Sequence, residues 1–362
     1  MNKTLLHISL ISGVGPAVVQ HVLDTVAADV LHVLYEWRTS DFVQRLGCTQ
    51  RIAHKLVEGL ADHVLLEKEI ELLIKHDIQC ITIDEVAYPS LLRQIYLPPT
   101  VLYCRGTFPT AMPCISFVGA RKANHYAKRV LSSLVPPLVE AGQAIVSGGA
   151  IGADAMAHAA AQQAGGITYA VIGSGLLQPY PASNRRLFEE IVAAGGAILS
   201  PFSLSTQALP GNFPARNRII AGLSTLTVVV QAAQRSGALI TARFALEQGR
   251  EVGALPGDIT DPLSAGCHAL LQEGAHPITN AQDILTLCGA GFAQTTQATS
   301  SESCLRNEVQ RDPIICACRY PRTLDELLDE LGIGYAELHK RLLDLQMQGI
   351  VEQDFLGRWL SK

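Results

Sequence analysis

Short apolar runs that alternate with helical segments in the middle of the chain constrain its fold more than any other feature. Segments of helical composition, such as Asp154–Ala164 and Leu239–Gln248, separate these runs. Six apolar strands with helical crossovers predict an α/β fold with a doubly wound parallel sheet that is buried on both faces. The expected strands are Cys114–Gly119, Ala144–Ser147, Thr168–Gly173, Ala197–Ser200, Thr225–Gln231 and Glu251–Pro256.

Glycine-rich or basic turns lie next to these runs. Crossovers in a parallel sheet share one hand, so the loops that leave the strands gather at its carboxyl edge. Glycines there allow backbone N–H groups to approach an anion closely, and arginines add positive charge. The pattern therefore predicts an anion site along one sheet edge. The turns read FVGARK (117–122), SGGAIGAD (147–154), GSG (173–175) with NRR (184–186), FPARNR (213–218) and QRSG (234–237).

Charge restricts where a polyanion can bind. The 362-residue chain has a formal net charge of −5. Residues 114–288 carry 11 basic and 10 acidic side chains, whereas the segments on either side are both acidic. Local field decides where a polyanion docks, so only the centre is expected to hold a positive patch.

Composition excludes several classes of protein. No run of 18 uncharged apolar residues is present, and the first 20 residues lack a signal-peptide cleavage pattern, so we expect a cytoplasmic protein without a membrane span. The nine cysteines have no metal-ligand spacing, which favours reduced, buried thiols. We expect no metal and no cofactor.

Smaller segments flank the expected sheet. Ile11–Leu23 contains the Gly-x-Gly-Pro turn of a helix-hairpin-helix, with Pro16 suited to the first helical position, and Leu46–Leu56 repeats it weakly. Such hairpins can hold a DNA phosphate, but the acidity of this region favours a structural role. The first hundred residues read as helical, with Tyr88–Gly106 as a connector. The predicted organisation is a helical helix-hairpin-helix/SAM-like domain (1–85), the sheet domain (86–288), a flexible linker (289–312) and a winged-helix domain (313–362).

The tail has the outline of a winged helix, with two helices followed by a short β pair around Gly357. Its second helix mixes acidic and basic residues. A protein contact or a structural role is at least as well supported there as reading of a DNA groove.

Glycine loops of this kind also occur in two classes of enzyme, which bind dinucleotides or hydrolyse nucleotides. A dinucleotide site requires G-x-G-x-x-G in the first turn and an acid after the next strand, whereas this chain has GARKAN and Ser147. A nucleotide phosphoribohydrolase needs a glutamate behind a glycine loop, and Glu247 lies too far along its helix. A nucleotide- or phosphoribosyl-processing enzyme remains the alternative function.

Asp154 and His158 are four residues apart and could form a metal site or an acid/base pair. A helix-start aspartate with a histidine partner explains them more simply. Tyr180 and Phe213 each precede a proline in a basic loop, where an aromatic ring could stack on an unpaired base or anchor the loop. Arg216 and Arg218 are two apart and must point in different directions, so one can reach phosphate while the other braces a loop. The chain thus reads as a binder and not as an enzyme.

The motifs of the centre closely resemble those of the bacterial DNA-processing protein A family (DprA, also called Smf). They occur in the family's order and span the whole expected sheet domain. The strings are FVGAR (117–121), SGGAIGADAMAH (147–158), VIGSGLLQPYPASN (171–184), FPARNRIIAGLS (213–224), RSGALITARFALEQGREVGALPG (235–257) and GCHALLQEGA (266–275).

The resemblance implies an extended Rossmann-like domain that binds single-stranded DNA, forms a homodimer and helps to load the RecA recombinase in natural transformation. It implies no enzymatic activity. Arg121 would hold phosphate, two glycine loops would cradle the backbone, and the FPARNR segment would complete the pocket. The site residues are Gly119, Arg121, Ser147, Gly148, Gly149, Gly152, Gly173, Ser174, Gly175, Tyr180, Asn184, Arg185, Arg186, Phe213, Arg216, Asn217 and Arg218.

Three positions depart from the family pattern. Ile151 stands where arginine is frequent, Ala182 where lysine is common, and Gln231 where glutamate usually follows the strand. The loss of two cations predicts weaker DNA binding, for which Arg185 and Arg186 could compensate.

Overall fold

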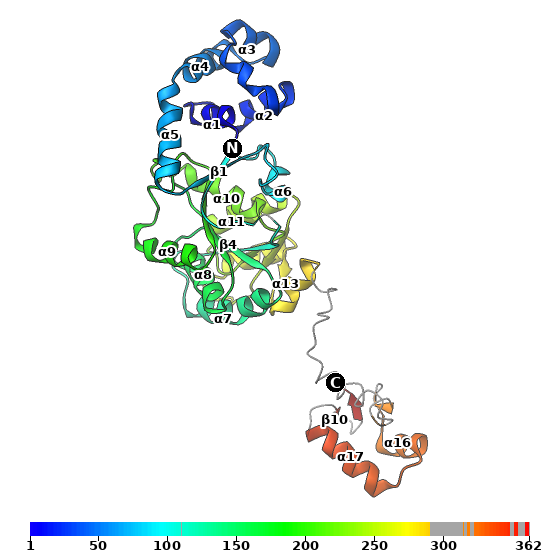
Figure 1. Ribbon diagram of the computed structural model, residues 1–362. Helices are drawn as coiled ribbons and strands as arrows, with labels where there is room; N and C mark the ends of the chain where they lie inside the picture. The colour runs from blue at the N-terminus through cyan, green and yellow to red at the C-terminus, as the bar shows by residue number, and fades with distance from the viewer. Residues whose placement is uncertain are drawn as a thin grey trace. The chain divides into compact units, whose positions relative to one another are not determined.

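The computed structural model describes residues 1–109, 111–289, 314, 317–318, 322–347, 351–353 and 359–361 (Figure 1). The chain divides into two compact units, Met1–Phe292 and Ala293–Lys362. Each unit is described by itself. The predicted linker, 289–312, lies outside the described residues except for Gly289.

A nine-stranded, mostly parallel sheet forms the centre of the first unit, with strand order β1-β2-β6-β5-β4-β3-β7-β8-β9. Strands β3 to β9 run parallel, whereas β2 pairs antiparallel with both β1 and β6. The α/β fold with a mostly parallel sheet is therefore confirmed, and all six expected strands are present. The parallel strands are β3 (Cys114–Val118), β4 (Ala144–Ser147), β5 (Thr168–Val171), β6 (Ala197–Ser200), β7 (Leu226–Val229), β8 (Glu251–Ala254) and β9 (His276–Pro277).

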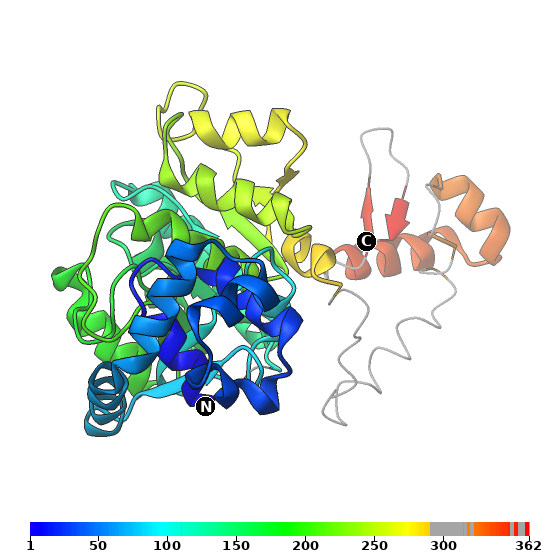
Figure 2. The same cartoon turned by 90° about the horizontal axis from the view of Figure 1, so that it is seen from above.

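Helices cover both faces of this sheet (Figures 1 and 2). One apolar cluster joins α7, α8 and α13 to side chains such as Ile115 and Ile145. On the other face, α10, α11 and α12 pack against side chains that include Val118 and Val146. The helices are α7 (His125–Glu140), α8 (Ala153–Gln163), α9 (Arg185–Ala193), α10 (Asn212–Gly222), α11 (Gly237–Glu247), α12 (Ala265–Gln272) and α13 (Ala281–Leu287).

The order of the strands creates a crevice at one position. From β3 the chain moves through α7 to β4, β5 and β6 on one side, and then returns to place β7 on the other side of β3. The loops after β3 and β7 therefore leave the sheet in opposite directions. Ligands of open α/β sheets bind at such a switch point, outside the carboxyl ends of the strands.

The first 78 residues form helices at one end of the sheet (Figures 1 and 2). Gly13, with φ of +80°, makes the turn before α2, and Pro16 occupies the first turn of that helix. The Glu69 carboxylate of α5 accepts a hydrogen bond from the Leu204 N–H at 2.8 Å, which ties these helices to the loop after β6. The elements are α1 (Lys3–Leu10), α2 (Pro16–Thr25), η1 (Ala28–Tyr35), α3 (Thr39–Leu46), α4 (Gln50–Ala61) and α5 (His63–Lys75).

The prediction that the first hundred residues are helical is wrong for one segment, and the predicted connector contains a further strand. Gln79–Thr82 forms β1 and Val101–Gly106 forms β2, while Ser90–Arg93 forms the short helix α6. The β2 segment was assigned to a proline-marked connector, although its side chains from Val101 to Cys104 are fully buried. Pairing with β6 decides its conformation, and a tertiary contact of that kind leaves no local signal.

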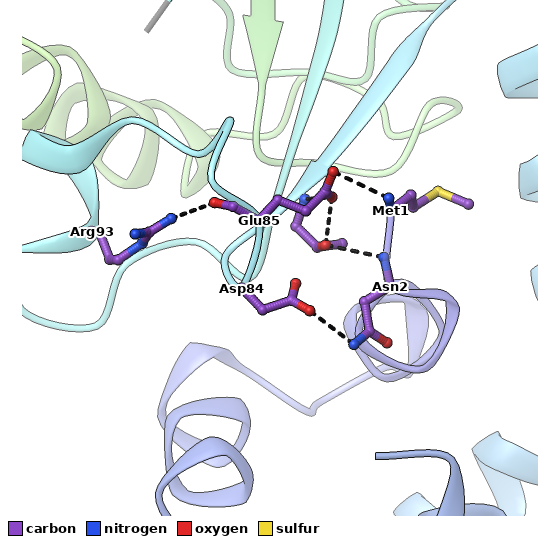
Figure 3. Close-up of polar contacts among 6 residues, drawn as sticks. Met1, Asn2, Asp84, Glu85 and Arg93 are labelled. Carbon is purple, nitrogen blue, oxygen red and sulfur yellow. Dashed lines mark hydrogen bonds and ion pairs between the residues drawn. The ribbon is translucent and has the colours of Figure 1, made fainter. Parts of the chain in front are cut away.

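Polar contacts join the first residues of the chain to the turn after β1 (Figure 3). The Met1 amino group lies 3.1 Å from the Glu85 carboxylate, and the Asn2 amide donates to Asp84 at 3.0 Å. The Arg93 guanidinium donates to the Glu85 carbonyl oxygen. Burial alone would raise the pKa of Glu85, but hydrogen bonds from Thr82 and the amino group hold that pKa below its usual value.

The second unit contains α16 (Leu324–Leu331), α17 (Tyr335–Met347) and the antiparallel pair β10 (Val351–Gln353) and β11 (Trp359–Ser361). A small core with Leu327, Leu338 and Trp359 holds these elements together. The two expected helices and the β pair are thus present, and the assignment to the winged-helix class stays a prediction.

Among the described residues no single helix is long and apolar enough to cross a membrane. Taken together, α2 and η1 have the length and composition of a membrane-spanning segment, but the two helices are bent by 108° relative to each other.

We expect Gly152→Ala to destabilise the first unit. Gly152 has φ of +91° and ψ of −130°, and an added Cβ would lie 2.4 Å from the Ala120 carbonyl oxygen. The strained backbone and the clash should lower the free energy of unfolding by about 1–3 kcal/mol in urea titrations. Gly165→Ala is the matched control, because Gly165 has φ of +70° at the other end of α8 with open space around it. Equal losses in the two variants would contradict the clash.

Candidate nucleic-acid interface

A cavity of about 390 Å³ lies at the switch point between β3 and β7. Its walls come from the loop after β3, the start of α8, the first half of α10, the loop after β7 and the first turns of α11. The lining residues are Val118, Gly119, Ala120, Arg121, Lys122, Ala150, Asp154, Phe213, Pro214, Arg216, Asn217, Ile220, Ala233, Arg235, Ser236, Gly237, Ala238, Ile240 and Thr241. We call this cavity the cleft.

Cations and aromatic rings meet at the mouth of the cleft. Arg121 and Lys122 are exposed, and the Arg121 guanidinium carbon lies 5.6 Å from the centroid of the Phe213 ring. The Phe213 and Tyr180 ring centroids are 5.7 Å apart, with the rings tilted by 57°. The sheet topology thus brings together side chains from two loops and from the first turn of α10.

A smaller hollow of about 30 Å³ adjoins the cleft on the aromatic side. Ile151 and Tyr180 flank it with exposed fractions of 53% and 44%. Its lining residues are Arg121, Gly148, Ala150, Ile151, Tyr180, Pro181, Phe213 and Arg216, of which four also line the cleft. Ile151 gives this hollow an aliphatic side chain at its edge.

Arg216 forms the floor of both spaces. Its side chain is 5% exposed, and its Nη1 donates to the carbonyl oxygens of Gly148 and Val171. Burial lowers the pKa of Arg216 to about 10, Asp154 opposes that shift, and Arg121 adds to it. The guanidinium therefore cross-links the ends of β4 and β5 from within, so it does not project into solvent as a phosphate-gripping side chain would.

Asp154 supplies the buried counter-charge. It is 7% exposed, and one carboxylate oxygen accepts the Ala150 N–H at 3.3 Å. Burial raises the pKa of Asp154, and the positive charge of Arg216 acts against that rise. An isolated buried charge costs several kcal/mol, so each of these two groups reduces the burial cost of the other.

Glycines in this region serve close packing. A Cβ on Gly148 would lie 2.3 Å from Arg216 Nη1 and 2.6 Å from the Asp154 carboxylate. A Cβ on Gly173 would lie 2.9 Å from Phe213, and one on Gly175 would lie 2.2 Å from the Ser203 carbonyl oxygen. A side chain at Gly148 would displace the floor residue Arg216, one at Gly173 would displace Phe213, and one at Gly175 would displace the backbone at Ser203.

The structure places several predicted site residues beneath the surface. Ser147, Gly149, Gly173, Ser174 and Gly175 are buried and line neither space. The Ser147 hydroxyl donates to the Phe117 carbonyl oxygen at 2.6 Å. These residues support the walls of the cleft, and the expected cradle of backbone amides at 173–175 is closed by the chain itself.

Other predicted residues face away from the cleft. Arg218 donates to the Tyr96 carbonyl oxygen at 2.7 Å, and so acts as the brace of the Arg216–Arg218 pair. Arg186 pairs with Glu190 at 2.7 Å, and Arg185 is exposed beside it. Neither of these two arginines lines the cleft or the smaller hollow, and their compensation for Ile151 stays a prediction. Asn184 donates to the Gly149 carbonyl oxygen at 2.9 Å and supports that loop.

The predicted site residues do not include one part of the cleft. Lys122 and the wall formed by Arg235, Ser236, Gly237 and Thr241 were not among the predicted site residues. The QRSG segment was recognised as a turn after a strand, which was the available signal. Only the pairing of β7 with β3 shows that this turn faces Arg121.

The Asp154–His158 pair does not form an acid/base unit. His158 is fully buried and its Nδ1 lies 2.7 Å from the Thr168 hydroxyl. Burial lowers the pKa of His158 to about 3, and Arg216 adds to that shift. Within the described part of the chain, no group of three or more His, Cys, Asp or Glu side chains could hold a metal ion.

We expect the stability of the first unit to depend on pH through His158. Its ordinary pKa is 6.5, so the unfolded chain binds a proton between pH 6.5 and about 3 that the folded chain does not. This contribution to stability is complete above pH 6.5 and decreases by up to about 1.4 kcal/mol per pH unit below it. Urea titrations between about pH 7 and pH 4.5 give the free energy of unfolding as a function of pH. The slope of this plot should be smaller in His158→Gln by the equivalent of about one proton. The exposed His125, changed to Gln, is the control, and an unchanged slope in H158Q would contradict the assignment.

Comparisons with known proteins agree on one family. A family model described as DNA recombination-mediator protein A matches residues 79–289, which is more than half of the chain. Protein Smf of Synechocystis is 32% identical over 386 residues, covering 96% of this chain and 95% of its own length. DNA processing protein DprA of Streptococcus pneumoniae is 44% identical over 199 residues, covering 55% of this chain and 70% of its own length.

Two solved structures have the same fold. The X-ray structure of DNA processing protein A from Streptococcus pneumoniae aligns with a TM-score of 0.68 at 36% identity, over 79% of this chain and 98% of that one. A Helicobacter pylori structure, whose subject is the single-stranded DNA binding mode of DNA processing protein A, aligns with a TM-score of 0.52 at 30% identity, over 57% of this chain and 94% of that one. The chain belongs to the DNA recombination-mediator protein A family, also known as DprA or Smf.

Proposed function

We propose that the protein binds single-stranded DNA in the cleft. Arg121 and Lys122 contact backbone phosphates, and Phe213 and Tyr180 provide aromatic faces for unpaired bases. The observation that carries this proposal is that exposed cations line the cleft at the switch point and that Phe213, on the wall of the cleft, lies beside Tyr180 of the adjoining smaller hollow. The related Helicobacter pylori protein, studied for its single-stranded DNA binding mode, supports it.

The geometry favours a single strand over a duplex. Base–aromatic stacking contributes about 1–3 kcal/mol per base and requires a base whose face is free. In duplex DNA the faces are covered by neighbouring base pairs, and the protein would reach only phosphates. Rings at the cavity mouth therefore add affinity for unpaired strands alone.

Positive charge in the cleft has two separate roles under this proposal. Arg216 carries a buried charge that its partner Asp154 compensates, and it fixes the loops. Arg121, Lys122 and Arg235 are exposed and provide the charge that phosphate neutralises. Binding then depends on salt through the exposed group, since each neutralised phosphate releases counterions.

We propose that this binding is not accompanied by catalysis. Asp154 is the carboxylate that lines the cleft, and its oxygen is engaged by the Ala150 N–H. A hydrolase acting on nucleotides needs a carboxylate that can reach substrate or water. Incubation of the protein with mononucleotides, followed by analysis for free base or sugar phosphate, tests this point, and any such product would support the alternative enzyme.

The further steps of the function are also proposals. The family description, recombination mediator, supports transfer of the bound strand to a RecA-type recombinase. By resemblance to the family, we propose that two copies associate through the sheet-containing domain and that the protein acts in the cytoplasm, where chromosomal DNA and recombinase occur. Natural transformation is the process in which such a mediator would act.

We expect the double variant Arg121→Ala/Lys122→Ala to bind poly-dT more weakly. The plot of log affinity against log salt should become shallower by about 1.4, because two phosphate contacts on a single strand are lost. Fluorescence anisotropy at several salt concentrations measures both quantities. Lys128→Ala/Arg129→Ala is the matched control, because it removes the same charge from exposed positions on α7 outside the cleft. If both doubles lose affinity equally, the cleft is not the binding site.

We expect the protein to shorten the lag before a RecA-type recombinase assembles on a strand coated with single-strand binding protein. The recombinase ATPase rate reports assembly. The Arg121→Ala/Lys122→Ala variant should leave the lag long, since a mediator that does not hold the strand cannot present it. A lag that the parent protein fails to shorten would refute the mediator role while leaving DNA binding intact.

A further inference from the structure

A second hollow of about 350 Å³ continues the cleft along α11. It shares Arg235, Ser236, Gly237 and Ile240 with the cleft, so the two spaces are contiguous. It then extends to Leu239 and Arg243 on the body of the helix. The complete lining is Gln234, Arg235, Ser236, Gly237, Leu239, Ile240 and Arg243. We call this hollow the α11 groove.

The lining of the α11 groove combines positive charge with apolar surface. Arg235 and Arg243 are exposed, and no acidic residue is in the lining. Ile240 is 42% exposed and lies three residues before Arg243, so the two side chains share one face of the helix. A floor of this kind can contact the sugars and bases of a strand while the two guanidinium groups contact its phosphates.

Both guanidinium groups are available to a ligand. Within the described parts of the chain, neither Arg235 nor Arg243 has a hydrogen bond or an ion pair. Glu247 is exposed one helical turn after Arg243, at the spacing of a helical ion pair, yet no ion pair connects them. Ser236 is already occupied, because its hydroxyl oxygen caps the Ala238 N–H at 3.3 Å.

Three hollows therefore form one path across the carboxyl edge of the sheet. The apolar hollow at Ile151 and Tyr180 shares Arg121 and Phe213 with the cleft, and the cleft shares Arg235 and Ile240 with the α11 groove. A flexible polyanion that is longer than the cleft must extend beyond one of its ends. The α11 exit is lined by two cations, and no carboxylate there would repel phosphate.

We infer that the α11 groove is a second subsite for the phosphodiester backbone of the same strand, with Arg243 as its outer phosphate contact. This inference rests on the proposed binding of single-stranded DNA in the cleft. The cleft holds the first nucleotides, and the groove receives the nucleotides that follow. Affinity should then increase with strand length in two stages, of which the second depends on Arg243.

The experiment compares two lengths of oligo-dT on the full chain, about 5 and about 16 nucleotides, within the range of single-strand site sizes. Arg243→Ala should weaken binding of the long strand about threefold or more at about 0.1 M salt, and its salt slope should decrease by about 0.7. Binding of the short strand should not change. Arg243→Lys should restore most of the affinity for the long strand, because it restores the charge.

Two controls separate this inference from the proposed function. Arg129→Ala removes an equally exposed arginine from α7 and should leave both lengths unaffected. Arg121→Ala should weaken both lengths, since its side chain lies in the cleft. If Arg121→Ala changes neither length, the proposed function fails.

Three outcomes would overturn the inference while leaving binding in the cleft intact. The first is an unchanged affinity of R243A for the long strand, and the second is an equal loss for both lengths. The third is a change in the mass of the free protein in light scattering, which would show that Arg243 lies in a contact between copies of the chain.

Discussion

The buried guanidinium of Arg216 is the interaction on which the cleft depends. Its hydrogen bonds to the carbonyl oxygens of Gly148 and Val171 join the ends of two neighbouring strands, β4 and β5. Gly148 directly follows the last residue of β4, and Val171 is the last residue of β5, so both carbonyls lie where the regular pairing of the sheet ends. Guanidinium suits this position, because its planar fork offers several donors and stays charged when it is buried.

The buried guanidinium of Arg216 also restricts which residues can lie next to it. Gly148 must lack a side chain because Arg216 and Asp154 approach its Cα from two directions. Asp154 must be acidic or an equivalent acceptor, since an uncompensated cation at 5% exposure would cost several kcal/mol. With the buried charges paired electrostatically, the net positive charge of the site lies with the exposed Arg121, Lys122 and Arg235. Under the proposed function, different cations would then support the structure and bind the strand.

Much of the fold followed from the sequence because its signals are local. Apolar runs of four or five residues, each followed by a glycine turn, predict buried parallel strands and the edge where their loops gather. The strand β2 could not be predicted, because only its pairing with β6 distinguishes it from a connector. Spacing showed that Arg216 and Arg218 diverge, but not which one points inward, since that depends on the packing of α10 against the sheet.

The candidate site was predictable in outline for the same reason. Arg121, Phe213 and Tyr180 lie in segments that follow different strands, and the structure places all three around the smaller hollow beside the cleft. The wall at Arg235 and Gly237 was not among the predicted site residues. Its position depends on β7, which lies beside β3 in the sheet although three other strands separate the two in the sequence. Neighbour relations of that kind are a property of the strand order, which no segment of the sequence contains.

The crevice of this sheet is also unsuited to a dinucleotide, for reasons visible in its walls. Ser147, at the position where an acidic residue would hold ribose hydroxyls, is buried and donates to the Phe117 carbonyl oxygen. Gly119 lines the cleft, but a Cβ there would meet Ala153 at 2.6 Å and the Gln231 backbone at 3.2 Å, so this wall requires glycine. The open part of the switch point is the cleft, which continues into the α11 groove. A ligand that is long, anionic and flexible matches these connected spaces better than a compact cofactor does.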